Sequence, residues 1–229
     1  MGAMRNNRRK TRLLVTGFGA FPGAPGNPTL AIIARLARSR RFAHLGVELE
    51  VRALPVIYAG SEARLASIIA QIRPDAILHL GLAARRKGIS VETRALNRSH
   101  PLRVDAARRP PEAARVLPRG PHMLAARWSA PRIATAAGQS GAPAALSIDA
   151  GDYLCNQTLY LTLSTTSVPA GFIHVPLPRG ARPGEKNARR PTLATLVRAI
   201  EEAALSLAVQ ARASARQVGR AASRISDDT

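Results

Sequence analysis

Residues 147–160 read SIDAGDYLCNQTLY and contain Cys155, the only cysteine among the 229 residues of the chain. The apolar run at 144–149 predicts a short strand, the Ala-Gly-Asp triplet at 150–152 predicts a turn, and apolar residues at helical spacing follow. We therefore expect Cys155 where a strand leads into the first turn of a helix. At such a position, free backbone N–H groups and the helix dipole favour a thiolate. A lone cysteine is more often a small buried apolar residue, so this stretch alone leaves both interpretations open.

Strands and helices alternate along the rest of the chain, which is typical of an α/β domain with helices on both faces of the sheet. We expect a three-layer α/β/α sandwich around a central, twisted, largely parallel (mixed) sheet. Residues 98–121, rich in Arg and Pro, are expected to form a long surface loop. The predicted strands are 12–18, 47–55, 76–81, 88–97, 144–149 and 171–178, and the other predicted helices are 29–41, 60–73, a segment near 120–128, a short turn at 132–139, and a long helix from 191.

The length of the chain suits a single domain, which we expect to span residues 12–212. Residues 1–11 are expected to be a basic tail, and residues 213–229 a polar C-terminal tail. A single cysteine excludes an intrachain disulfide framework and fits a reducing compartment, so we expect a cytoplasmic protein. No apolar run reaches the roughly 18 residues that a membrane span needs, so no membrane association is expected.

The net charge of +20 arises from 34 Lys and Arg residues against 14 Asp and Glu residues. These cations are scattered along the chain, and no zinc-finger spacing, aromatic RNA-binding motif or helix-turn-helix accompanies them. We expect no specific nucleic-acid partner, only salt-dependent nonspecific binding. Paired cysteines and an HExxH motif are both missing from the sequence, so no metal or cofactor is expected.

A nucleophilic cysteine needs a base and a group that orients the base. His174 lies near the carboxyl end of the predicted strand 171–178, where ligands of open α/β sheets gather. His79 lies inside an apolar strand and is expected to be a hydrogen-bonded core residue. Glu92 stands out as a carboxylate in the predicted strand 88–97, although an exposed edge glutamate is an equally good interpretation of its spacing.

Four stretches taken together resemble the pyroglutamyl peptidase I (pyrrolidone-carboxylate peptidase) family of cysteine peptidases. They occur in the family's order and bracket most of residues 12–178, which makes the resemblance strong although each motif alone is weak. The stretches are LLVTGFGAFPGAPGNPT (13–29), PDAILHLGLAARRKGISVETRALN (74–97), SIDAGDYLCNQTLY (147–160) and GFIHVPLP (171–178).

The resemblance implies a catalytic triad of Cys155, His174 and Glu92. Cys155 would attack the carbonyl of an N-terminal pyroglutamyl residue, and His174 would take the thiol proton and pass it to the leaving amine. Glu92 would hold the imidazole in the useful tautomer. The implied partners are peptides with N-terminal pyroglutamate and further copies of the chain, as a homo-oligomer (dimer or tetramer).

A pyroglutamyl ring is a neutral, flat lactam, so its pocket should combine apolar walls with a few hydrogen bonds. Phe18 and Phe21 match the family's ring-binding aromatic positions, and Tyr153 is a further candidate for the wall. Backbone N–H groups at the start of the cysteine helix are candidate oxyanion donors. Arg103, which roughly matches a family arginine, is a second candidate.

Two departures from the family pattern bear on the substrate. Leu82 stands where the family usually has Gln, which removes an amide from the ring pocket, and Thr93 stands where Arg normally follows the glutamate. Two other functions therefore stay open at the level of sequence. One is a weakly active or inactive relative that binds acidic partners through its basic surface. The other is an amidase for a related cyclic substrate.

Overall fold

The computed structural model describes residues 9–20, 26–181 and 189–227, with side chains in the last helix described as far as residue 217. Its centre is a six-stranded sheet in the order β2-β1-β3-β8-β4-β7. The strands β2, β1, β3 and β8 are parallel to one another, whereas β4 runs antiparallel to β8, and β7 runs parallel to β4. The strands are β1 (Thr11–Phe18), β2 (Val47–Leu54), β3 (Ala76–Leu82), β4 (Ile89–Glu92), β7 (Ala144–Ser147) and β8 (Ala170–Val175).

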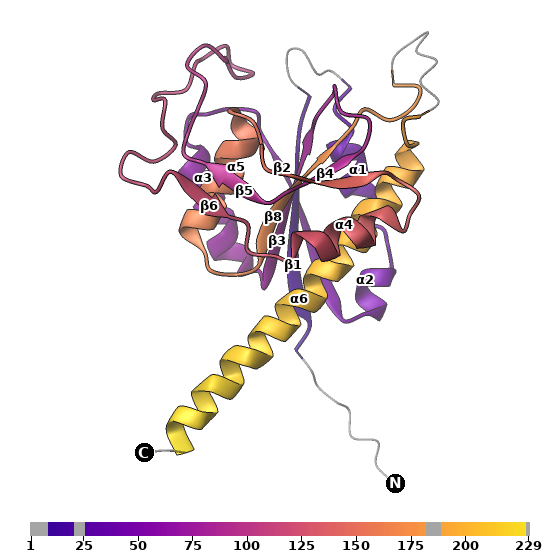
Figure 1. Ribbon diagram of the computed structural model, residues 1–229, viewed down its shortest axis with the longest axis vertical. Coiled ribbons are helices and arrows are strands. Elements are labelled where there is room, and N and C mark those ends of the chain that lie inside the picture. Colours follow the sequence, from indigo (N-terminus) through magenta and orange to yellow (C-terminus); the bar gives the residue numbers. More distant parts are fainter. Residues whose placement is uncertain (1–8, 21–25, 182–188, 228–229) are drawn as a thin grey trace.

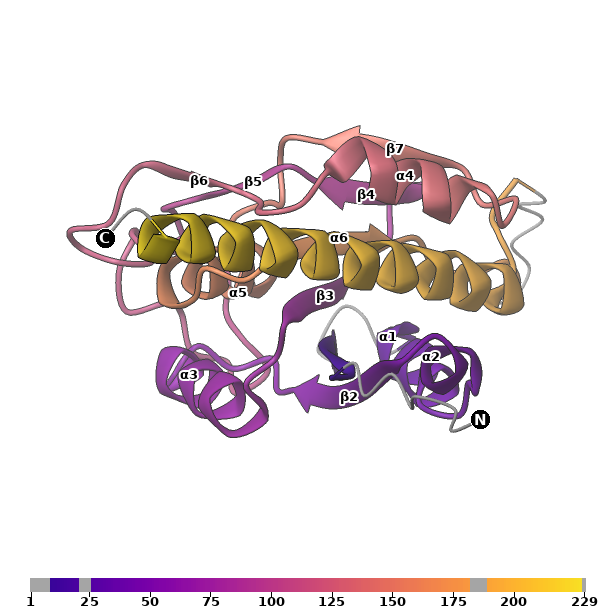
Figure 2. The same cartoon turned by 90° about the horizontal axis from the view of Figure 1, so that it is seen from below.

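Helices cover both faces of this sheet (Figures 1 and 2). Because side chains alternate across a strand, β1 sends Leu13 and Val15 into one buried apolar cluster and Leu14 and Phe18 into the other. The first cluster lies under α1 (Thr29–Leu36), α2 (Arg41–His44), α4 (Ala130–Gly138) and α6 (Leu193–Asp227), and the second under α3 (Ser61–Ile72) and α5 (Leu154–Thr165). The expected three-layer α/β/α architecture with a mixed sheet is confirmed.

The predicted strand 88–97 is in fact two strands in different sheets. β4 ends at Glu92, and β5 (Arg94–Leu96) pairs antiparallel with β6 (Met123–Ala125) in a separate two-stranded sheet. Thr93 marks the break, because its backbone N–H and its hydroxyl both donate to the carbonyl oxygen of Ser147. The helix predicted near 120–128 is therefore wrong: part of that segment is a strand whose backbone partners lie about 30 residues earlier in the chain.

Two helices also differ in extent from the prediction. The segment 29–41 forms α1, a turn and the short α2 instead of one helix. In contrast, α6 continues to Asp227 as one helix of 35 residues, where the sequence predicted a polar tail from residue 213. Ala, Arg and Gln have high intrinsic helix propensity, and they extend the helix beyond the last residues that it buries, near Ala211. Across the described residues, no helix combines the length and the apolar character that crossing a membrane requires.

Candidate active site

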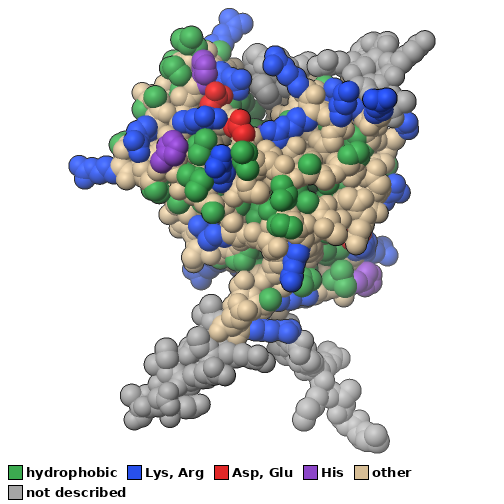
Figure 3. Space-filling view, viewed as in Figure 1, with side chains coloured by type: hydrophobic (Ala, Val, Ile, Leu, Met, Phe, Trp, Pro, Cys, Tyr) green, Lys and Arg blue, Asp and Glu red, His purple; other side chains and the backbone are tan. Residues whose placement is uncertain are grey.

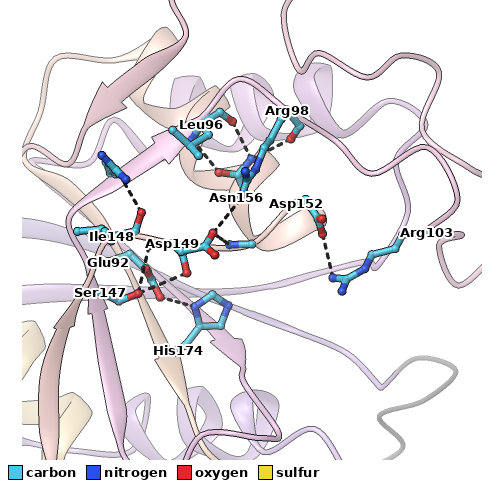
Figure 4. Close-up of polar contacts among 12 residues, drawn as sticks. Glu92, Leu96, Arg98, Arg103, Ser147, Ile148, Asp149, Asp152, Asn156 and His174 are labelled. Atoms are coloured by element: carbon cyan, nitrogen blue, oxygen red, sulfur yellow. Dashed lines mark hydrogen bonds and ion pairs between the residues drawn. The ribbon is translucent and has the colours of Figure 1, made fainter.

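The register of β4 on β8 brings Glu92 and His174 together. Glu92 lies directly opposite Phe172, and Ser90 lies opposite His174, so Glu92 and His174 are diagonal neighbours on one face of the sheet. The Nδ1 atom of His174 lies 2.8 Å from the Oε1 atom of Glu92 (Figure 4). Glu92 is fully buried and His174 is 6% exposed. The interpretation of Glu92 as an exposed edge residue is therefore wrong.

Cys155 is the second residue of α5, as the local sequence pattern predicted. The helix begins after Tyr153, whose backbone is extended and whose side chain makes no capping hydrogen bond. Because β7 runs opposite to β8, the carboxyl ends of these strands do not meet, and residues 148–153 carry the chain back toward His174. Gly81 at the end of β3 permits this approach, since a Cβ atom there would lie 2.8 Å from the Cys155 Sγ atom.

Burial and the neighbouring groups act on the charge of His174 in opposite directions. Burial disfavours the imidazolium, but the negative charge of Cys155, a hydrogen bond with its sulfur, and the Glu92 carboxylate outweigh burial and raise the pKa of His174 to about 9. The raised pKa makes the His174 imidazole a ready proton acceptor. Glu92 holds Nδ1, which leaves Nε2 as the nitrogen that faces Cys155. A cysteine beside an imidazole that is oriented by a buried carboxylate is suited to nucleophilic attack on a carbonyl carbon.

A cavity of about 500 Å³ opens in front of this pair and includes Cys155 and His174 in its lining. Its walls are largely apolar, which suits a compact neutral group better than a charged one. Asp149 and Gly151, from the segment before the cysteine, form part of its rim. The apolar lining residues are Phe18, Val56, Leu82, Ala83, Val104, Ala150, Tyr153 and Leu154.

The binding residues predicted from the sequence have different outcomes. Phe18, Leu82, Tyr153 and Arg103 all line the cavity, whereas Phe21 lies outside the described residues. The Tyr153 hydroxyl donates to the carbonyl oxygen of Val104, and burial, together with Asp105 and Cys155, raises the pKa of this tyrosine to about 12.

Arg103 is held by an ion pair. Its Nη1 atom lies 3.0 Å from the Oδ1 atom of Asp152, three residues before the cysteine (Figure 4). Arg103 thus lines the cavity with its guanidinium paired to the segment that precedes Cys155.

His79 is a structural histidine, as predicted from its apolar strand. Its Nδ1 atom lies 2.7 Å from the Thr16 hydroxyl and its Nε2 atom 2.8 Å from the Thr162 hydroxyl, and the residue is fully buried. Burial lowers the pKa of His79 to about 3. The neutral ring thus joins β1, β3 and α5 beneath the site.

Two residues that the sequence analysis missed support the site. Asn156 binds the backbone at the end of β5 (Figure 4). Its Oδ1 atom accepts a hydrogen bond from the Leu96 N–H, and its Nδ2 atom donates to the carbonyl oxygens of Leu96 and Arg98. Arg86 donates from Nη1 to the Glu92 Oε1 atom at 2.9 Å. In the sequence, Arg86 is one of three consecutive cations in a polar turn, where solvent exposure is the default. No local signal singles out Arg86, because the sequence leaves open the burial of Glu92, which is what creates the need for a second partner.

In the described ranges, no three His, Cys, Asp or Glu side chains gather as a metal ion would require.

Comparisons with known proteins identify the relatives of this chain. The model of the family described as pyroglutamyl peptidase matches residues 11–213. A pyrrolidone-carboxylate peptidase of Gloeobacter violaceus is 35% identical over 197 residues, which cover 83% of this chain and 93% of that protein. The pyrrolidone-carboxylate peptidase of Pyrococcus furiosus is 33% identical over 171 residues, or 72% of this chain and 80% of its own length.

Solved structures agree as well. Pyroglutamyl peptidase I of Bacillus amyloliquefaciens superposes with a TM-score of 0.78 at 25% identity, covering 87% of this chain and 98% of the other. The pyrrolidone carboxyl peptidase of Thermus thermophilus superposes with a TM-score of 0.74 at 32% identity, covering 83% and 97%. With the family model spanning most of its length and relatives above 30% identity over most of theirs, this chain belongs to the pyroglutamyl peptidase family of cysteine peptidases.

Proposed function

We propose that this protein removes pyroglutamate from the N-terminus of peptides, with Cys155 as nucleophile, His174 as acid–base and Glu92 as the residue that orients His174. The observation that carries the proposal is the buried 2.8 Å contact between His174 and Glu92, on an imidazole whose pKa the neighbouring Cys155 raises to about 9. We assign the activity to a single domain spanning residues 12–212. A homo-oligomer, dimer or tetramer, and a cytoplasmic location complete the proposal.

The reaction begins when the Nε2 atom of His174 takes the proton of the Cys155 thiol. The Cys155 sulfur attacks the carbonyl carbon of the pyroglutamyl residue, and the electron pair of the carbonyl bond moves to its oxygen. Backbone N–H groups in the first turn of α5 stabilise this oxyanion, with Arg103 as a second candidate donor. His174 then gives its Nε2 proton to the leaving amine nitrogen, and the C–N bond breaks to leave a thioester. The neutral His174 next takes a proton from water, whose oxygen attacks the thioester and releases pyroglutamate and the Cys155 thiolate.

Substrate selection follows from the walls of the cavity. Phe18, Tyr153 and Leu82 offer flat or branched apolar surfaces against a lactam ring, and Phe21 is the further aromatic residue of the proposed ring site. Leu82 contributes no hydrogen bond from its side chain, so the ring amide must find its partners among the other groups of the lining, on the backbone or on polar side chains such as Asn27.

The test is the release of aminomethylcoumarin from pyroglutamyl-aminomethylcoumarin under reducing conditions. We expect turnover by the natural protein, none by Cys155→Ser, and a strong reduction by Glu92→Gln. Alkylation of the thiol should abolish the activity, and pyroglutamate analogues should protect against alkylation. Absence of turnover by a folded protein with a free Cys155 thiol would overturn the proposal. Other cyclic amides would then be tested.

A further inference from the structure

The Glu92 carboxylate has an unusual environment for a charged group. It is fully buried, and its Oε1 atom receives both the His174 Nδ1 contact at 2.8 Å and the Arg86 Nη1 hydrogen bond at 2.9 Å. Its Oε2 atom is buried and has no hydrogen-bond partner in the described part of the chain. Burying a charge costs free energy unless the charge is paired. His174 and Arg86 together offset the cost of burying the Glu92 carboxylate.

Arg86 contacts more than the carboxylate. Its Nη1 atom lies 3.3 Å from the Ser147 hydroxyl at the end of β7, and its Nη2 atom donates to the Asp149 carbonyl oxygen at 2.9 Å. Residues 147–149 lead directly into the segment that carries Cys155, and Figure 4 shows Ser147 and Asp149 beside Glu92 and His174. One guanidinium therefore joins the orienting carboxylate to the chain that delivers the nucleophile.

We propose that Arg86 is a positioning residue of this active site: it fixes the Glu92 carboxylate against His174 and sets the path of residues 147–149 toward Cys155. The inference rests on the proposed function for its catalytic meaning. A planar guanidinium suits the role because its fork of donors reaches a carboxylate and a backbone carbonyl in one fixed geometry, which a lysine ammonium does not reproduce.

The chain offers a matched control in the same turn. Arg85 is exposed, whereas Arg86 is half-buried, with 35% of its side chain accessible. Arg86→Gln should lower kcat on pyroglutamyl-aminomethylcoumarin by about 10- to 100-fold with little change in KM, the range expected when a group that supports a reactive side chain is removed. Arg85→Gln removes the same charge and should leave kcat within about twofold. Arg86→Lys should recover only part of the activity.

A double-mutant cycle separates positioning from a general effect on folding. If Arg86 acts through Glu92, then Arg86→Gln should cost much less in a Glu92→Gln background than in the natural protein, because the group that it positions is already impaired. Equal losses in both backgrounds would overturn the proposal, and so would equal losses in Arg85→Gln and Arg86→Gln. Urea unfolding of each variant identifies any that fail to fold. If Arg86→Gln fails to fold, the same cycle is measured with Arg86→Lys and Glu92→Gln.

A second readout does not depend on the substrate. Iodoacetamide is neutral, so its rate of reaction with Cys155 reports the state of the Cys155–His174 pair and not charge steering. We expect Arg86→Gln to slow alkylation at pH 7 several-fold and Arg85→Gln to leave it unchanged. If the natural protein fails to cleave the coumarin substrate yet shows this difference, the proposed substrate is wrong and the role of Arg86 stands. If alkylation is unaffected by Arg86→Gln, the positioning role is wrong.

Discussion

His174 and His79 face the same layer of helices, yet their surroundings drive their charges in opposite directions. His174 meets two anionic groups, and its pKa rises to about 9, whereas His79 meets only two hydroxyls, and burial lowers its pKa to about 3. Burial is comparable at the two sites, so the partners decide the outcome. Each histidine leads to a pH dependence of its own.

The His174 imidazolium should define the alkaline limit of catalysis. Because the leaving amine takes its proton from His174, kcat/KM should fall as the pH rises through about 9. Removing the sulfur in Cys155→Ser takes away two of the influences that raise the pKa, so the His174 ring should titrate at lower pH in that variant. Both effects are measurable, by a pH–rate profile and by NMR titration of the assigned ring. An unchanged titration in Cys155→Ser would contradict the Cys155–His174 pair.

His79 should weaken the fold in acid. Its pKa is about 6.5 in the unfolded chain and about 3 in the folded protein, so the unfolded state binds the extra proton first. The free energy of unfolding should therefore fall as the pH drops from 6.5 toward 3, by up to about 1.4 kcal/mol per pH unit from this group. Urea unfolding between pH 4 and pH 7 should show a flatter dependence in His79→Gln than in the natural protein. The exposed His44→Gln variant should keep the natural slope.

At the scale of elements, the long connection 98–121 is organised around one buried carboxylate. Asp105 is 1% exposed and accepts hydrogen bonds from the backbone N–H groups of Tyr58, Ala107 and Arg109. The adjacent Val104 and Arg103 line the cavity. A loop without helix or strand thus presents a defined surface to the substrate.

Asp105→Ala leaves three backbone N–H groups without their acceptor, and that of Tyr58 is buried, so it should lower the free energy of unfolding by about 2 kcal/mol. It should also raise KM, because the cavity wall formed by residues 103 and 104 loses its anchor. Glu112→Ala, on an exposed part of the same loop, should change neither quantity. The measurements are urea unfolding and steady-state kinetics. An increase in KM of equal size in Glu112→Ala would show that the loop as a whole, and not Asp105, sets the wall.

The sequence predicted best those elements whose signals are local. The strand, turn and helix around Cys155 follow from the continuous stretch 144–160, and the position of His79 follows from its apolar strand. The antiparallel direction of β4 relative to β8 does not follow from local sequence, because it depends on pairing between segments about 80 residues apart. The same applies to β6, which takes its conformation from β5. Arg86 lies six residues from its partner in sequence, but nothing local indicates that Glu92 is buried.

On the scale of the whole molecule, the excess positive charge is spread over the surface and also borders one depression. Figure 3 shows Lys and Arg side chains over most of one face with few acidic side chains between them. At the end of the sheet where the parallel strands begin, Arg9, Lys10, Arg212 and Arg216 border a depression of about 510 Å³, and Asp75 is the one acidic residue of its described lining.

This basic end should bind polyanions without regard to sequence. We expect a duplex DNA fragment to bind at low salt, with an affinity that falls linearly in log–log form as salt rises. Exchanging Lys10 and Arg216 for Glu should weaken binding and reduce that slope by about 0.9 for each phosphate that the protein no longer neutralises. Fluorescence anisotropy between 50 and 300 mM salt measures both quantities. Cys155→Ser should have no effect.

A control pair, Arg119→Glu with Arg132→Glu, makes the same change of net charge on other exposed surfaces. An equal loss of DNA affinity in this pair would show that total charge matters and that the basic end has no special role.

The first strand and the last helix meet at one end of the molecule. β1 begins at Thr11, whose hydroxyl accepts a hydrogen bond from Arg212 of α6, and α6 then extends away from the body (Figure 1). Cys155 and His174 open at the opposite end, where β3 and β8 finish. A carrier protein or a solid support attached near Thr11 or near the end of α6 would therefore lie away from the mouth of the cavity and leave it facing open solution. This enzyme should therefore stay accessible to peptides when it is attached to a support near the start of β1 or near the end of α6.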